Sequence, residues 1–185
     1  MIESILVTLL PVLFLTILIS SGEKFRHRNI DMDGEPPIDR TLFYLSKYSI
    51  ILVWVAMSIR SWGVILPVEV TQELKWLSLF LWISGFVPLF IARFGLGDSF
   101  RIGSPKEATN LRVDGLFRLS RNPMYVGVYS TLLASCLYAC NPLIFLVSIF
   151  IVVVHHKIVL AEEQYLRKEF GDEYLQYCNR VRRYL

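Results

Sequence analysis

A polar block where a charged stretch runs into an apolar one is the first feature of this chain that could do chemistry. The block reads Arg-Asn-Pro-Met-Tyr-Val-Gly at residues 121–127. Pro123 suits the first turn of a helix, because its missing N–H leaves no hydrogen bond unmade there. The free N–H groups and the positive dipole end of that turn can hold an anionic group. The structural alternative is an ordinary helix start with Asn122 as N-cap and Arg121 reaching the membrane interface.

Two acidic residues, Glu162 and Glu163, lie where the last apolar segment ends. Carboxylates at a membrane border are costly unless they are paired or bound. One of them could hydrogen-bond a ribose diol or the ammonium group of a ligand, and a solvated helix turn is the alternative. Arg167 follows Glu163 at a spacing of one helical turn and would pair with it. We therefore expect Glu162 to be the member that faces a ligand.

Two adjacent histidines, His155 and His156, precede the two glutamates by about two helical turns, so each histidine shares a helix face with one glutamate. A polar pair inside an apolar segment indicates a functional role. The alternative is that both rings bond to nearby carbonyl groups. A functional histidine here could accept a proton or orient a substrate near neutral pH.

Apolar segments of membrane-spanning length must position these residues. The chain has 185 residues, of which 54% are hydrophobic, and a mean hydropathy of +0.49. This is too apolar for an ordinary soluble domain of this size. The sequence predicts an all-α membrane protein with about five transmembrane helices, at residues 2–20, 41–60, 74–94, 124–140 and 142–160.

The polar connections predict further features of the fold. The Cys-Asn-Pro sequence at residues 140–142 predicts a minimal turn between two antiparallel helices. After residue 160 the pattern becomes that of an amphipathic helix on the membrane surface, broken at Gly171. Gly85 indicates a close approach or bend in the third segment.

Lys and Arg gather after the first, third and fifth segments, whereas Arg60 and Lys75 are the basic residues assigned to the opposite side. The positive-inside rule therefore predicts an N-terminus outside and a C-terminus in the cytosol, which puts the polar blocks on the cytosolic face. Contact with anionic membrane lipids accounts for most of this charge, and nucleic-acid binding is not indicated. Three cysteines make no disulfide framework, and no Cys/His spacing resembles a zinc site, so we expect no metal.

At these blocks the chain resembles the isoprenylcysteine carboxyl methyltransferase and phospholipid methyltransferase superfamily. That family carries, in order, a Leu-Gly-x-x-Trp stretch, a Leu-Val-x-x-Gly-x-Tyr stretch, an Arg-His-Pro-x-Tyr-x-Gly block, a Glu-Glu pair and a Phe-Gly-x-x-Tyr-x-x-Tyr block. The corresponding stretches here are residues 96–100, 111–117, 121–127, 162–163 and 170–177. The resemblance covers roughly the C-terminal half and extends to the five-helix layout.

The resemblance implies S-adenosylmethionine as the cofactor. It implies a single domain over residues 1–185, with the first three helices in residues 1–94 and the cofactor-binding half in residues 95–185. Arg121, with His155 or His156, would orient the acceptor. The residues that the resemblance places on the cofactor are Thr109, Asn110, Leu111, Arg112, Phe117, Asn122, Pro123, Met124, Tyr125, Glu162 and Glu163.

Three positions depart from the family pattern. Asn122 replaces the usual His, so it can hydrogen-bond but cannot act as a base. Phe117 replaces a Tyr and lacks its hydroxyl group. Ile158 stands where the prenylcysteine enzymes carry a substrate-binding Arg, and the candidates to replace that Arg are Lys157, His155 and His156.

The activity that the resemblance implies is methyl transfer to a lipophilic small molecule or lipidated substrate, most simply at a carboxylate. Such an enzyme acts mainly by positioning donor and acceptor. A carboxylate acceptor needs no general base, whereas a phospholipid amine, the alternative acceptor, needs one, and either histidine could serve. Two further alternatives are an NADPH-dependent membrane reductase of the sterol reductase type and a non-catalytic membrane protein. The oligomeric state does not follow from the sequence.

Overall fold

The described residues of the chain fold into a bundle of five α-helices. A computed structural model describes residues 1–27, 35–64, 69–96 and 111–185, and within these ranges it contains no β-strand. A short 3₁₀ helix, η2, spans Gly115–Arg118. The α-helices are α1 Ile2–His27, α2 Arg40–Ser61, α3 Gln72–Leu96, α4 Pro123–Ala139 and α5 Pro142–Arg180.

The all-α membrane architecture predicted from the sequence is confirmed. Four of the helices, α1, α2, α3 and α5, are long and apolar enough to cross a membrane. Helix α4 has 17 residues, which is at the lower limit for a span. The predicted fifth segment and the amphipathic helix predicted after it form one helix, α5, which continues through strong helix formers as far as the kink at Gly171.

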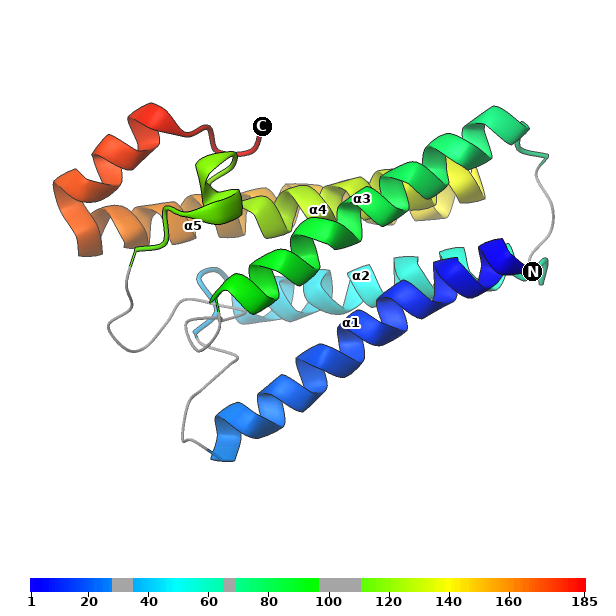
Figure 1. The fold of residues 1–185 in the computed structure, drawn as a ribbon, viewed down its shortest axis with the longest axis horizontal. Coiled ribbons are helices and arrows are strands. Elements are labelled where there is room, and N and C mark those ends of the chain that lie inside the picture. Colours follow the sequence, from blue (N-terminus) through cyan, green and yellow to red (C-terminus); the bar gives the residue numbers. More distant parts are fainter. Residues whose placement is uncertain (28–34, 65–68, 97–110) are drawn as a thin grey trace.

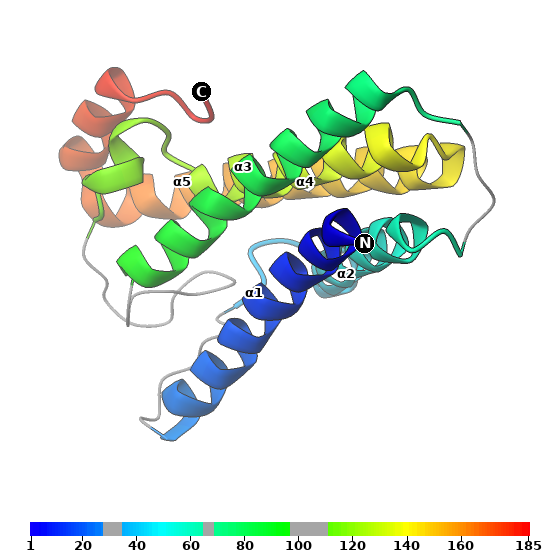
Figure 2. The same ribbon diagram turned by 45° about the vertical axis from the view of Figure 1, so that its right-hand side comes forward.

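Helices α3 and α4 form the most extensive pair in the bundle (Figure 1). The turned view shows α3 crossing over α4 along much of its length (Figure 2). Helix α2 packs against both α4 and α5, and α1 packs against α2 and α3. The start of α4 is therefore held by neighbours on several sides.

Two glycines allow the close approach of α3 and α4. A Cβ atom added to Gly85 would lie 2.8 Å from the carbonyl oxygen of Gly127, and one added to Gly127 would lie 2.5 Å from that of Gly85. Small residues of this kind let helix backbones meet in a membrane. The close approach predicted at Gly85 is confirmed, and Gly127, the last residue of the 121–127 block, is its partner.

Buried aromatic rings and interhelical hydrogen bonds form the core. Phe14, Trp54, Trp82 and Phe86 pack together with centroid distances between 5.0 and 6.4 Å. The indole N–H of Trp54 donates to the Thr131 hydroxyl at 3.0 Å. Polar groups in an apolar surrounding need such partners, and these bonds therefore fix the relative register of the helices.

Two local features bring the C-terminal part of the chain back to the start of α4. Cys140 takes a left-handed conformation with φ 44°, and the side chain of Asn141 caps α5, which confirms the predicted minimal turn. The predicted break at Gly171 is also confirmed, because this residue has φ 50° and ψ −123° inside α5. Beyond it the helix changes direction, and the chain ends close to η2 and α4 (Figure 1).

Candidate functional site

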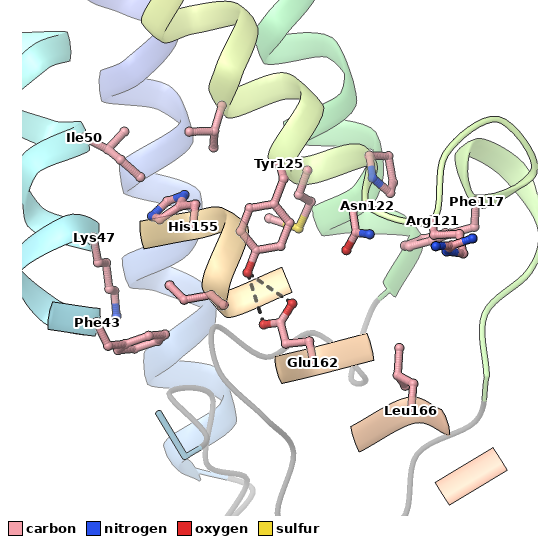
Figure 3. Close-up of a pocket in the computed structure, with 14 residues that line it drawn as sticks. Phe43, Lys47, Ile50, Phe117, Arg121, Asn122, Tyr125, His155, Glu162 and Leu166 are labelled. Carbon is pink, nitrogen blue, oxygen red and sulfur yellow. Dashed lines mark hydrogen bonds between the residues drawn. The ribbon is translucent and has the colours of Figure 1, made fainter. Parts of the chain in front are cut away.

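A cavity of about 300 Å³ lies between α2, α4 and α5, beside η2 (Figure 3). This volume is at the lower end of the range of ligand pockets. The side chains around it come from α2, η2, α4 and α5, and from the two residues just before α4. They are Phe43, Lys47, Ile50, Phe117, Arg121, Asn122, Pro123, Met124, Tyr125, Val128, His155, Ile158, Glu162 and Leu166.

The start of α4 supplies one wall. Pro123 occupies the first turn, as predicted, and Asn122 is the N-cap residue but makes no capping hydrogen bond with its side chain. Asn122, Pro123, Met124 and Tyr125 all line the cavity. The dipole end of α4 is thus directed to the cavity, an arrangement suited to polar or anionic ligand atoms.

Glu162 of α5 faces Tyr125 across the cavity. The Tyr125 hydroxyl donates to the two carboxylate oxygens of Glu162, each at 3.1 Å (Figure 3). This bond connects the 121–127 block to the Glu-Glu pair, which are separate in sequence. The expectation that Glu162 is the glutamate on the ligand side agrees with its place on the cavity wall.

Glu163 has a different environment, and its predicted pairing with Arg167 is wrong. Its side chain is only 10% exposed, and its carboxylate lies between two arginines. Arg121 approaches Oε1 with Nη2 at 3.0 Å and Nε at 3.2 Å, and Arg183 approaches Oε2 with Nη2 at 2.8 Å and Nε at 3.0 Å. Two bidentate contacts make this a strong charge-assisted cluster. Hydrogen bonding to Glu163 raises the pKa of Arg183 above its ordinary value.

The last residues of the chain form a strap over the start of α4, here defined as residues 181–184. The backbone N–H of Arg121 donates to the carbonyl of Arg182 at 2.9 Å, and Arg121 Nη1 donates to that of Val181 at 2.8 Å. The side-chain amide of Asn122 donates to the carbonyl of Arg183 at 3.2 Å. Much of the hydrogen-bonding capacity of Arg121 is therefore used within the protein.

The two adjacent histidines separate into different surroundings. His155 lines the cavity, is 6% exposed, and meets the Tyr125 ring edge-on with 5.6 Å between centroids. Its Nδ1 is buried and has no hydrogen-bond partner within the described residues. His156 is not among the cavity residues, and its Nδ1 lies 2.8 Å from the hydroxyl of Tyr184 in the strap. The predicted face sharing is seen for His155 with Glu162, on the cavity.

The stretch before α4 contributes one cavity residue. Phe117 of η2 lines the cavity, and its carbonyl accepts a 2.6 Å hydrogen bond from the Tyr177 hydroxyl. Leu111 and Arg112 are not among the cavity residues, and Arg112 Nη2 instead donates to the carbonyl of Gly95 at 2.8 Å. The remaining two predicted cofactor residues, Thr109 and Asn110, lie outside the described residues, as does most of the 96–100 stretch.

Sequence reasoning missed the α2 wall of the cavity and the strap. Lys47 could have been identified from the sequence, because it is a charged residue inside a predicted membrane segment. Arg183 could not have been identified in this way, because nothing in its local sequence indicates a contact with Glu163. Within the described residues, no group of three or more His, Cys, Asp and Glu side chains is arranged to hold a metal ion.

Comparison with known proteins matches this chain to a protein family. Residues 70–173 match the family described as phospholipid methyltransferase. The matched part is more than half of the chain and runs from the start of α3 to just beyond Gly171. A protein of Haemophilus influenzae, described as an uncharacterized protein, is 44% identical over 63 residues, which are 34% of this chain and 100% of that protein.

Proposed function

Because this chain belongs to the phospholipid methyltransferase family, an integral-membrane superfamily that includes the isoprenylcysteine carboxyl methyltransferases, we propose that it transfers a methyl group from S-adenosylmethionine to a lipophilic acceptor. The reaction would take place in the cavity between α2, α4 and α5. The observation that carries this proposal is the position of Glu162, which brings a half-buried carboxylate to the helix start formed by the 121–127 block.

The residues on the cavity wall suit the cofactor. Its adenosine and amino acid parts require hydrogen-bond acceptors for hydroxyl and ammonium groups, and the Glu162 carboxylate is such an acceptor. The first-turn N–H groups and the dipole end of α4 offer complementary donors. When bound, the cofactor supplies a methyl group that its sulfonium centre has already activated.

The remaining task of the protein is positioning. Tyr125 orients the Glu162 carboxylate, and the cluster of Glu163 with Arg121 and Arg183 holds the start of α4 against α5. We propose that Arg121 acts mainly through this cluster and orients the acceptor indirectly. Met124, Val128 and Ile158 give the cavity apolar walls, which would help to keep water from the reacting groups once donor and acceptor are bound.

The acceptor proposed from the sequence is a carboxylate, which needs no general base. A phospholipid amine is the second candidate. The placement of His155 on the cavity wall favours it, since an amine acceptor must lose a proton. The family match gives no support to the NADPH-dependent reductase.

We also propose that the cavity lies on the cytosolic side of the membrane, as the distribution of Lys and Arg predicts. The short connection between α4 and α5 would then lie outside. Reporter fusions at the C-terminus test this orientation. A fluorescent reporter there should be active and a periplasmic phosphatase inactive, and the reverse pattern would contradict the proposal.

Cofactor binding can be measured directly by calorimetry with S-adenosylhomocysteine and the full chain in a non-ionic detergent. We expect binding, with Glu162→Gln weakening it by about tenfold or more through loss of a charge-assisted contact. Glu169→Gln is the matched control, because Glu169 is an exposed residue of the same helix outside the cavity. NADPH is the control ligand. Folded protein that binds NADPH, or neither ligand, would overturn the proposal.

A further inference from the structure

His155 is a buried polar residue on the cavity wall whose hydrogen-bonding capacity the protein leaves unused. Its Nδ1 has no hydrogen-bond partner within the described residues. Several other buried side-chain atoms there share this property, but Nδ1 of His155 is the one among them that belongs to a cavity residue. Because an unpaired buried polar atom is unfavourable, its position on the cavity indicates that a ligand supplies the partner.

The cavity has two levels along α5, marked by Glu162 and His155. These residues are about two helical turns apart, a rise of about 10 Å. Tyr125 lies between them, since its hydroxyl donates to Glu162 and its ring meets that of His155 edge-on. Figure 3 shows His155 beside the Tyr125 ring and Glu162 at its hydroxyl group. The groups assigned above to the cofactor lie at the level of Glu162, which leaves the level of His155 for a second ligand.

Apolar side chains from three helices line the cavity together with His155. They are Ile50 of α2, Val128 of α4 and Ile158 of α5. Lys47 of α2 also lines the cavity, but its ammonium group is already engaged within the chain, in contacts that include the Tyr44 ring at 5.6 Å. A ligand at this level therefore meets mainly apolar surface and one unpaired imidazole.

We propose that His155 binds the polar head of the acceptor by a hydrogen bond, and that the apolar part of the acceptor contacts Ile50, Val128 and Ile158. This position puts the head beside Tyr125 and so next to the cofactor groups at Glu162. A neutral imidazole offers one donor and one acceptor, which suits a small head such as a hydroxyl, an amine or a carboxylate. The identity of this ligand as methyl acceptor rests on the proposed function, whereas head-group binding at His155 does not.

A single hydrogen bond in an apolar surrounding is selective. A ligand without a polar head would leave the buried ring unpaired, and the site would discriminate against it. The same bond requires only a side chain that can donate or accept at this place. His155 is therefore proposed as a residue that selects and orients the acceptor, whether or not a proton is removed there.

The test uses the full chain in a non-ionic detergent, with isotope-labelled histidine and four probes of equal chain length: decanol, decylamine, decanoate and decane. We expect at least one probe with a polar head to shift the imidazole nitrogen resonances of His155, which are identified by their absence in His155→Gln. Decane should not shift them. In calorimetry, His155→Leu should bind the same probe about three- to tenfold more weakly, and His155→Gln should lose less because it keeps a hydrogen-bonding amide. His156→Leu is the control, since His156 is outside the cavity.

The probes and variants separate the outcomes. A shift with decanoate supports a carboxylate head, one with decylamine an amine and one with decanol a hydroxyl. Unchanged His155 resonances with every probe would overturn the proposal without any variant, as would equal binding by the wild type and a folded His155→Leu protein. S-adenosylhomocysteine binding by His155→Leu shows that its fold is intact. Head-group binding at His155 by a wild type that binds no S-adenosylhomocysteine would refute the proposed function but support this site.

Discussion

The hydroxyl of Tyr125 donates a hydrogen bond to both carboxylate oxygens of Glu162, at 3.1 Å each. Tyr125 lies in the first turn of α4 and Glu162 lies on α5, so this contact joins the two helices at the cavity. A half-buried carboxylate held by a hydroxyl donor keeps capacity to accept further hydrogen bonds from a ligand. The contact therefore orients Glu162 and leaves its oxygens able to accept from a ligand.

Tyr125→Phe removes the hydroxyl and leaves the Glu162 carboxylate without this donor. We expect S-adenosylhomocysteine to bind about tenfold more weakly, because a hydrogen bond to a charged group contributes about 1.5–3 kcal/mol. Calorimetry measures the change. Tyr48→Phe, an exposed position on α2, is the control. Equal binding by Tyr125→Phe and the wild type would contradict an orienting role for Tyr125.

Arg183→Ala removes one of the two arginines that bind Glu163. We expect a loss of about 1–2 kcal/mol in the free energy of unfolding, which is less than the ~3–5 kcal/mol typical of a fully buried pair. The reduction follows from the 37% exposure of the Arg183 side chain. Thermal unfolding in detergent measures it, with Arg182→Ala as control because the Arg182 side chain is exposed. Equal destabilisation by the two variants would show that the Glu163 contact is not the cause.

His155→Gln distinguishes the two acceptor classes. With a carboxylate acceptor we expect methyl transfer to stay within a few-fold of the wild-type rate, because no proton has to be removed. The measurement is methyl transfer from labelled S-adenosylmethionine, with His156→Gln as the matched variant outside the cavity. A loss of about 10²–10⁴-fold confined to His155→Gln would contradict the carboxylate and favour an amine. S-adenosylhomocysteine binding should be unchanged in both variants.

Gly127→Ala should separate α3 from α4. The added Cβ would lie 2.5 Å from the carbonyl oxygen of Gly85, and a backbone atom cannot yield as a flexible side chain can. We expect a destabilisation of about 1–3 kcal/mol, together with weaker cofactor binding because α4 carries the 121–127 block. Gly95→Ala is the control, since nothing lies within 4 Å of a Cβ there. Thermal unfolding that changes equally in both variants would contradict the packing argument.

Much of the architecture could be predicted because it depends on local patterns. Long apolar runs require helices in a membrane, since only internal hydrogen bonds satisfy the backbone there. The break at Gly171 and the turn at residues 140–142 could also be predicted from local patterns. Glycine and proline change the backbone conformation at their own positions, whatever the rest of the fold. The place of Glu162 on the cavity was also predicted, although the reason given for it, a pairing of Glu163 with Arg167, was wrong.

By itself, the sequence determined that the chain is a helical membrane protein and that its polar chemistry comes from residues 121–127, the histidine pair and the glutamate pair. Tertiary structure decided which member of each pair meets the cavity. Neighbours on a helix point about 100° apart, so periodicity relates His155 to Glu162 but does not say which face is covered. The tertiary structure also brought Arg183 to Glu163 and Lys47 to the cavity. Contacts between residues distant in sequence arise from the packing of whole helices, and no local pattern encodes them.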